Sequence, residues 1–200
     1  MLLDGGVIRK GFPIFVSSNI ELGKIAKNTI EVEKGFGNVR IGFGGVEGVQ
    51  YSKGYIRIDD NSKIIFKGTA RFALGSVILI GKQSTIQFGE LFNAGKNFFL
   101  SCNGKISFDD DILLGWNVSV RDNDGHTIVE QGVENEHTKP IKIGKHVWIG
   151  SDVLLLKGCE IADNNVVATR ACVTKQIRDE NCIIGGLPAR VIKKHIEWRR

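Results

Sequence analysis

The amino-acid sequence predicts an all-β protein whose chain coils as a parallel β-helix, and three observations lead to this prediction. Large apolar residues recur every six positions through much of the C-terminal half. Glycine is frequent, with 25 residues against 3 prolines, and isoleucine and valine dominate the apolar set. β-Branched residues favour strands and glycine favours turns. Neither the 3.6-residue period of an amphipathic helix nor the two-residue period of a strand meander fits the six-residue spacing.

The six-residue repeat is clearest near the end of the chain, where six apolar residues follow one another without a slip. They are Ile143, Ile149, Leu155, Ile161, Val167 and Val173. The next residue is often small, as at Gly144 and Gly150, which lets the backbone turn tightly. Three faces of this kind make a triangular coil of about 18 residues, and stacked coils line up the apolar residues inside. A β-sandwich with chance spacing is the less favoured alternative.

Changes in this rhythm divide the chain into three segments. Residues 1–50 are expected to form an N-terminal cap and irregular first coils, since the stretch 35–49 is rich in glycine. Residues 51–180 are expected to form the β-helix. Residues 181–200 are expected to form a C-terminal segment with a short basic helix, which Pro188 is placed to start.

The bulk composition narrows the classes of partner and compartment. The 200 residues carry a net charge of +5, which favours an anionic partner or a solvated basic face. No apolar run approaches the roughly 18–20 residues that span a bilayer, and the start does not resemble a secretory signal. Four cysteines without a Cys-x-x-Cys pair are expected to be reduced and buried. We therefore expect a cytoplasmic protein, with neither a nucleic-acid partner nor stable membrane insertion.

The rhythm breaks within the stretch "VRDNDGHTI". Counting by six from Phe108 arrives at His126, where an apolar residue is due, and the repeat resumes only at Ile141. The interruption predicts a loop insertion over about 122–140. A corner of a coiled chain tolerates such an insertion, and long loops on rigid repeats are often functional.

Histidine titrates near neutral pH, so His126 could act as a general base. Asp122 and Asp124 lie close enough in the sequence to accept a hydrogen bond from one ring nitrogen. Equally, Asp, Asn and Gly are turn formers, and His126 could be a polar turn residue. The other three histidines are expected at the solvated surface. They are His137, His146 and His195.

Other chemistries have little support in the sequence. A three-histidine zinc site would need His126, His137 and His146 to converge, but no two of them have a short strand spacing, so no metal is expected. The chain has no Gly-x-Ser-x-Gly elbow and no phosphate-binding glycine loop.

Two stretches carry a family resemblance. "IKIGKHVWIGSDVLLLKGCEIADNNVVATRACVTK" (141–175) and "GGLPARVIKK" (185–194) resemble the hexapeptide-repeat acyltransferases, in the branch of galactoside, maltose and xenobiotic acetyltransferases. "RDNDGHTI" is similar to the version found in O-acetyltransferases of bacterial surface-polysaccharide pathways. The resemblance covers about residues 100–194.

The resemblance implies a left-handed β-helix and a homotrimer, with each active site in the cleft between neighbouring subunits. Acetyl-CoA would lie along that cleft as co-substrate. His126 matches the family's base, which removes the proton from an acceptor hydroxyl as the oxygen attacks the thioester. Trp148 matches a residue that lies against the cofactor arm.

Further positions follow from the same resemblance. Ser151 and Thr169 match residues that hydrogen-bond the thioester end and the pantetheine arm. The family usually has glycine where this chain has Arg170, which would narrow the cofactor groove or contact CoA itself. The positions that match the nucleotide end are Thr174, Lys175, Arg190 and Lys193.

The acceptor side matches less well. The family's acceptor-binding asparagine falls near Ser101 or Asn103 without a clean match, and Gly125 fits either a close approach to substrate or a plain turn. The resemblance implies O-acetylation of a sugar hydroxyl, in a surface polysaccharide or its precursor, with a small-molecule or oligosaccharide acceptor. The alternatives are an N-acetyltransferase for a nucleotide-linked amino sugar, a xenobiotic acetyltransferase and a non-catalytic β-helix scaffold.

Overall fold

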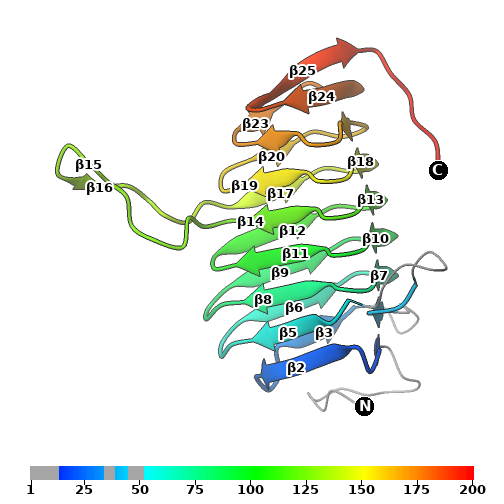
Figure 1. Ribbon diagram of the computed structural model, residues 1–200, viewed down its shortest axis with the longest axis vertical. Coiled ribbons are helices and arrows are strands. Elements are labelled where there is room, and N and C mark those ends of the chain that lie inside the picture. The colour runs from blue at the N-terminus through cyan, green and yellow to red at the C-terminus, as the bar shows by residue number, and fades with distance from the viewer. Residues whose placement is uncertain (1–13, 34–38, 45–51) are drawn as a thin grey trace.

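The computed structural model describes residues 14–33, 39–44 and 52–200. It confirms the parallel β-helix: the chain winds through three stacked sheets that form the walls of a triangular prism (Figure 1). Most of the glycine-rich stretch 35–49, expected to be a wide coil or turn, lies outside the described residues.

The three walls are named here A, B and C. Wall A contains, in spatial order, β1 (Ile14–Val16), β4 (Val39–Ile41), β7 (Ala70–Phe72), β10 (Phe92–Ala94), β13 (Ile112–Leu114), β18 (Val147–Ile149), β21 (Val166–Val167), β24 (Cys182–Gly186) and β25 (Ala189–Lys194). Wall B contains β2 (Ile20–Ile25), β5 (Gly54–Ile58), β8 (Val77–Ile80), β11 (Phe99–Cys102), β14 (Ser119–Arg121), β19 (Leu154–Leu156) and β22 (Cys172–Val173). Wall C contains β3 (Ile30–Val32), β6 (Lys63–Phe66), β9 (Thr85–Phe88), β12 (Lys105–Phe108), β17 (Ile141–Ile143), β20 (Glu160–Ile161) and β23 (Gln176–Ile177).

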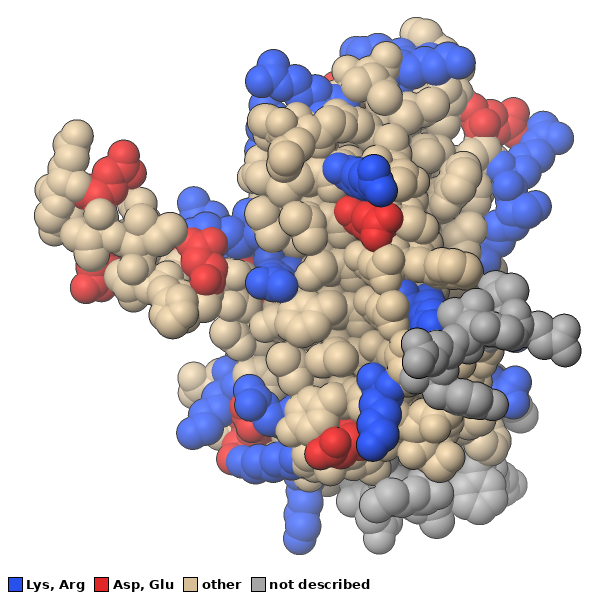
Figure 2. Space-filling view, in the orientation of Figure 1, with Lys and Arg blue, Asp and Glu red and all other residues tan. Residues whose placement is uncertain are grey.

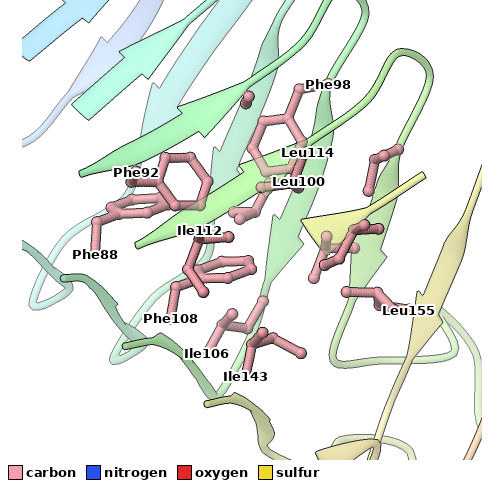
Figure 3. Close-up of a cluster of buried hydrophobic side chains, with 14 of the residues drawn as sticks. Phe88, Phe92, Phe98, Leu100, Ile106, Phe108, Ile112, Leu114, Ile143 and Leu155 are labelled. Carbon is pink, nitrogen blue, oxygen red and sulfur yellow. The ribbon is translucent and has the colours of Figure 1, made fainter. Parts of the chain in front are cut away.

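The short strands alternate between interior and exterior, as the pleat of a strand requires. In β17, Ile141 and Ile143 are buried while Lys142 points outward. All six residues of the unbroken repeat are buried, which confirms the interior ladder. Phenylalanines fill the middle of the prism: the rings of Phe88 and Phe108 stack with centroids 5.6 Å apart (Figure 3).

The corner between walls A and B has a regular backbone. In five successive coils one residue of this A/B corner takes a positive φ, a conformation that Gly, Asn and Asp adopt most readily. These residues are Gly75, Asn97, Asn117, Asp152 and Arg170. The side-chain amide and carboxylate groups of Asn97, Asn117 and Asp152 form a ladder along the corner. Asn97 Nδ2 donates to Asn117 Oδ1 at 3.0 Å, and Asn117 Nδ2 donates to Asp152 Oδ1 at 2.8 Å.

The N-terminal coils are longer than the later ones, which accounts for the slips in the sequence rhythm. Phe66, Phe88 and Phe108 are partners in register on wall C, yet lie further apart in sequence than Ile143 and Ile161, the corresponding pair later on. Strands β1–β4 already belong to the walls, and β2 pairs with β5 through a register irregularity.

The predicted C-terminal helix is wrong. Residues 189–194 instead form β25, which pairs antiparallel with β24. β24 ends at Gly186, with φ +100°, and the turn that follows contains the cis Leu187–Pro188 bond. Without β25, β24 would be the last strand of wall A and would leave a row of unpaired backbone groups. Pairing with β25 satisfies these groups. No helix long and apolar enough to cross a bilayer occurs in the described parts of the chain.

Candidate active site

The interrupted repeat becomes a loop that leaves the body at the corner between walls B and C. Phe108 on β12 pairs directly with Ile143 on β17, so the chain between β14 and β17 projects without displacing the next coil. Figure 1 shows this segment standing away from the body, on the side opposite β18. The predicted insertion over 122–140 therefore has its counterpart in the structure.

Asp122 fixes the point where the loop leaves. Its side chain is fully buried, and its two carboxylate oxygens accept hydrogen bonds from the backbone N–H groups of Asn103 and Gly104, each at 2.8 Å. The Cys102 thiol also donates to it, at 3.5 Å. All three residues belong to the preceding coil. The Asp122 carboxylate thus binds the loop to the wall, and His126 is not among its partners.

The two arms of the loop are joined in a neck above Asp122. The Lys139 N–H donates to the Asp122 carbonyl at 2.9 Å, and the Asp124 N–H donates to the His137 carbonyl at 3.0 Å. Lys157, at the corner between walls B and C in the following coil, forms an ion pair with Asp124 and donates to the Glu136 carbonyl. The neck therefore has a defined shape although most of its residues are exposed.

His126 lies between the neck and a terminal hairpin. The hairpin pairs β15 (Val129–Glu130) with β16 (Val133–Glu134) and carries exposed apolar side chains, of which Val133 has 67% of its surface accessible. The His126 side chain is exposed and hydrogen-bonds to none of the described residues. Within one chain, neither Asp122 nor Asp124 hydrogen-bonds to it, so its role as a base stays a prediction.

The predicted cofactor residues of the middle coils gather at the A/B corner. Ser151 and Thr169 occupy equivalent positions in successive coils, and the Arg170 N–H donates to the Ser151 carbonyl at 3.0 Å. The backbone N–H groups of Ser151 and Thr169 have no acceptor among the described residues. Two unpaired donors therefore lie in line along this corner, available to a bound molecule.

Trp148 points outward from wall A with 42% of its surface exposed. Its ring centroid lies 6.1 Å from that of Trp198, a residue that the sequence analysis placed in the expected C-terminal helix and not at the site. Trp198 is buried, and the C-terminal segment runs back along the side of wall A to reach it (Figure 1). The signal in the sequence was a tryptophan in an otherwise polar, basic tail.

The expectation that His146 is solvated is wrong. Its ring stacks on Trp198 with centroids 4.0 Å apart, and its Nδ1 lies 2.5 Å from Asp111 Oδ2. The Arg200 Nε donates to the other oxygen of Asp111 at 2.6 Å. These contacts join positions 35 to 89 residues apart, so local sequence gave no sign of them.

The remaining cofactor candidates lie elsewhere. Thr174 and Lys175 occupy the corner between walls B and C, the corner from which the loop leaves, and both are exposed. Arg190 and Lys193 lie on β25 and are also exposed. The cofactor candidates are thus divided among three places: the two corners that border wall B, and the hairpin of β24 and β25. Within one chain, wall B separates the loop from the A/B corner.

The acceptor candidates cluster at the base of the loop. Ser101, on β11, faces outward, and its hydroxyl lies 3.4 Å from Asn123 Nδ2. Asn103 is held through its backbone by Asp122. Gly125 has a φ of +78°, and a Cβ added there would meet nothing within 4 Å, so none of the described residues crowds it. The residues that the structure describes contain no group of three acidic, histidine or cysteine side chains that could hold a metal ion.

Comparison with known proteins identifies the family. Over 148 residues, 72% of this chain and 69% of the relative, the sequence is 32% identical to the polysialic acid O-acetyltransferase of Neisseria meningitidis. It is 34% identical over 114 residues to the galactoside O-acetyltransferase of Escherichia coli. The chain belongs to the hexapeptide-repeat acetyltransferases. It spans about half the length of several curated relatives, such as 45% of the Escherichia coli polysialic acid O-acetyltransferase.

Solved structures agree on the fold. The polysialic acid O-acetyltransferase OatWY superposes with a TM-score of 0.57 at 25% identity, covering 94% of this chain and 90% of that one. The polysialic acid-specific acetyltransferase NeuO gives a TM-score of 0.63 at 21% identity, covering 92% and 90%. These matches confirm the left-handed β-helix. No family model matches the sequence.

Proposed function

We propose that the protein transfers an acetyl group from acetyl-CoA to a sugar hydroxyl, in O-acetylation of a surface polysaccharide or its precursor. The observation that carries this proposal is the exposed histidine of the loop, His126, whose neck is hydrogen-bonded to the body of the protein. The relatives of this chain are named O-acetyltransferases of polysialic acid and galactosides. The polar acceptor candidates Ser101 and Asn103 at the base of the same loop support a hydroxylated acceptor.

The functional unit that we propose is a homotrimer built around wall B. The outer face of this wall carries a ladder of Val77, Phe99, Ser119 and Leu154, and Leu154 is 41% exposed. In the view of Figure 2, charged side chains are sparse across the middle of the body, where β8, β11 and β14 run in Figure 1. An exposed apolar face of this kind favours association.

Threefold packing on wall B would solve the problem of the divided site. The A/B corner of one copy would then face the loop corner of the next, so that His126 of one chain approaches Ser151 and Thr169 of its neighbour. The exposed apolar tip of the loop, including Val133, would also gain a surface to cover it.

The A/B corner fits a CoA molecule by its chemistry. Small hydroxyl side chains at Ser151 and Thr169 leave room beside two unpaired N–H donors, and the exposed faces of Trp148 and Leu154 flank them for a flexible, partly apolar arm. The cationic side chains nearer the C-terminal end of the β-helix suit the phosphates of CoA. They are Arg170, Lys175, Arg190 and Lys193.

Acetyl-CoA would supply an acyl group activated as a thioester. The chain's own part in the reaction is then to move one proton and to stabilise one developing charge. His126 accepts the proton of the sugar hydroxyl as that oxygen bonds to the acetyl carbonyl carbon, since an alcohol is a poor nucleophile at neutral pH. It returns the proton to the sulfur of the departing CoA as the C–S bond breaks. The N–H groups at the A/B corner donate to the carbonyl oxygen as it becomes negative. Asp124 holds the neck and thereby the position of His126.

We place this activity in the cytoplasm. All four cysteines are buried and free, with no disulfide between them, which suits a reducing compartment.

The test is acceptor-dependent thiol release from acetyl-CoA, with sialic acid oligomers and methyl β-galactoside as acceptors. For His126→Ala we expect kcat to fall by about 10²-fold or more. His137→Ala is the matched control, an exposed histidine in the same loop whose ring hydrogen-bonds, among the described residues, only to the neighbouring Thr138, and it should retain activity. Unchanged turnover in His126→Ala would remove His126 from the mechanism.

A further inference from the structure

We propose that Trp116 is the platform on which the acceptor sugar ring stacks, and that it therefore determines acceptor specificity. The inference rests on the proposed transferase function and deepens it. Trp116 was not among the residues that the sequence resemblance assigned. Its place at the A/B corner, its exposure and its polar neighbours carry the argument.

Trp116 lies directly next to the proposed reaction centre. It occupies the position equivalent to Ser151, one coil earlier along the A/B corner, and its backbone N–H donates to the Ser151 hydroxyl at 3.1 Å. The Asp152 N–H in turn donates to the Trp116 carbonyl at 2.8 Å. The backbone of Trp116 is therefore fixed relative to the residue that faces the thioester end.

The indole is exposed, and one edge of it packs on the preceding coil. Trp116 has 46% of its surface accessible, although tryptophan is a residue that folding usually buries. A Cβ added to Gly95, in the preceding coil, would lie 2.8 Å from Trp116 Cδ1, so the ring packs on that glycine. A side chain larger than hydrogen at position 95 would displace it. The exposed part of the ring is left for a ligand.

The surroundings of Trp116 suit a sugar. The polar ladder of Asn97, Asn117 and Asp152 follows the same corner and supplies amide and carboxylate groups that can meet hydroxyls. The face of an indole carries partial negative charge and attracts the C–H bonds on the face of a pyranose ring. An aromatic surface beside a few fixed polar groups is the usual construction of a small-molecule site.

The direction along the corner separates the two substrates. Thr169 and Arg170 lie in the coil after Ser151, towards the basic hairpin of β24 and β25 that suits the nucleotide. Trp116 lies in the coil before it. In the threefold arrangement this earlier coil faces the loop of the neighbouring copy, with His126 and the outward-facing Ser101. The side of the cleft nearer Trp116 is thus the side for the acceptor.

Steady-state kinetics on the intact protein tests this assignment with Trp116→Ala and Trp116→Phe. The probes are a sialic acid oligomer and methyl β-galactoside as acceptors, with acetyl-CoA varied separately. We expect Trp116→Ala to raise the KM for the acceptor by tenfold or more and leave the KM for acetyl-CoA within twofold. Trp116→Phe, which keeps an aromatic face, should recover much of the loss. Light scattering checks that the assembly of each variant matches that of the wild type.

Several outcomes would overturn the assignment. An unchanged acceptor KM in Trp116→Ala removes the platform, and equal increases in both KM values make Trp116 a general structural residue. Loss of assembly in both variants makes it an interface residue. Saturation-transfer NMR with the same sugars separates this inference from the proposed function. Sugar binding that depends on Trp116, without acetyl transfer, keeps the platform and rejects the transferase, whereas absence of both binding and transfer rejects both.

Discussion

The Oδ2 atom of Asp122 lies 2.8 Å from the backbone nitrogen of Gly104. This contact joins the first residue of the loop to the corner of the preceding coil, within the part of the structure where side chains are buried. A loop whose tip is surrounded by solvent therefore begins from a fixed point. Four predictions follow from this and related contacts, each with its own measurement.

Replacing Asp122 should destabilise the fold. Asp122→Ala removes a fully buried carboxylate and leaves two part-buried backbone donors, on Asn103 and Gly104, without their acceptor; an unsatisfied buried donor costs about 1–3 kcal/mol. We expect the free energy of unfolding, from chemical denaturation, to fall by about 2–4 kcal/mol. Glu134→Ala, at an exposed position of the hairpin, is the control and should stay within about 0.5 kcal/mol. Equal effects of the two changes would contradict the anchoring role.

The ion pair between Asp124 and Lys157 should position the neck more than it stabilises the fold. Both side chains are about a quarter exposed, and such pairs contribute little net stability. Asp124→Lys places two cations together and should lower kcat by about tenfold or more, in line with misplacement of a catalytic group. The double variant Asp124→Lys, Lys157→Asp should recover part of that loss. No recovery would indicate instead that the Asp124 carboxylate acts on His126 itself in the assembled enzyme.

The attachment of the C-terminal segment should depend on pH through Asp111. Burial acts to raise the pKa of this carboxyl, but hydrogen bonds from His146 and Arg200 outweigh it and hold the pKa below its ordinary value of 3.8. A carboxyl whose pKa is lowered in the folded state stabilises the fold at pH values above its ordinary pKa. This contribution is lost as the pH falls through the folded-state pKa.

The measurement is the difference in Tm between wild type and Asp111→Asn as a function of pH. Asparagine also tolerates the positive φ of +60° at this position, so the comparison isolates the charge. We expect the wild type to be more stable at pH 5 to 6, and the difference to shrink below about pH 4. A difference that is constant with pH would exclude the carboxylate as the cause.

The native cysteines should be unreactive. Burial raises the pKa of the Cys159 thiol to about 12, and burial together with the Asp122 charge raises that of Cys102. The thiolate is the reactive form, so a disulfide reagent at pH 8 should modify the native protein slowly and all four thiols after denaturation. Rapid reaction of a native thiol would show that one of them is more accessible than its burial indicates. An inert protein also leaves thiol release from CoA free of background.

The interior ladder could be predicted because the six-residue period is a direct consequence of one apolar residue per wall. Ile143 and Ile161 keep that spacing and are both buried. The irregular spacing before position 100 was less informative, since longer corners shift the count without changing the walls. Pro188 was misread because the residue suits both a helix start and a tight turn. The turn is favoured because it lets β25 pair with the edge of β24, and that edge exists only in the assembled sheet.

The site was predictable where its residues are consecutive or periodic. The loop around His126 stood out as a break in the count, and Ser151 and Thr169 fell on equivalent corner positions. The backbone partners of Asp122 could not be read from the sequence, because they belong to another coil. Trp198 and His146 meet across 52 residues, a distance at which no local pattern operates.

The direct pairing of Phe108 with Ile143 has a consequence for how the family can diversify. Because the wall closes beneath the insertion, the length of the inserted segment is uncoupled from the ladder that holds the fold together. Doubling such a loop adds only about 0.6 kcal/mol of closure entropy. The segment that carries His126 can therefore change in length and sequence while the neighbouring coils keep their packing.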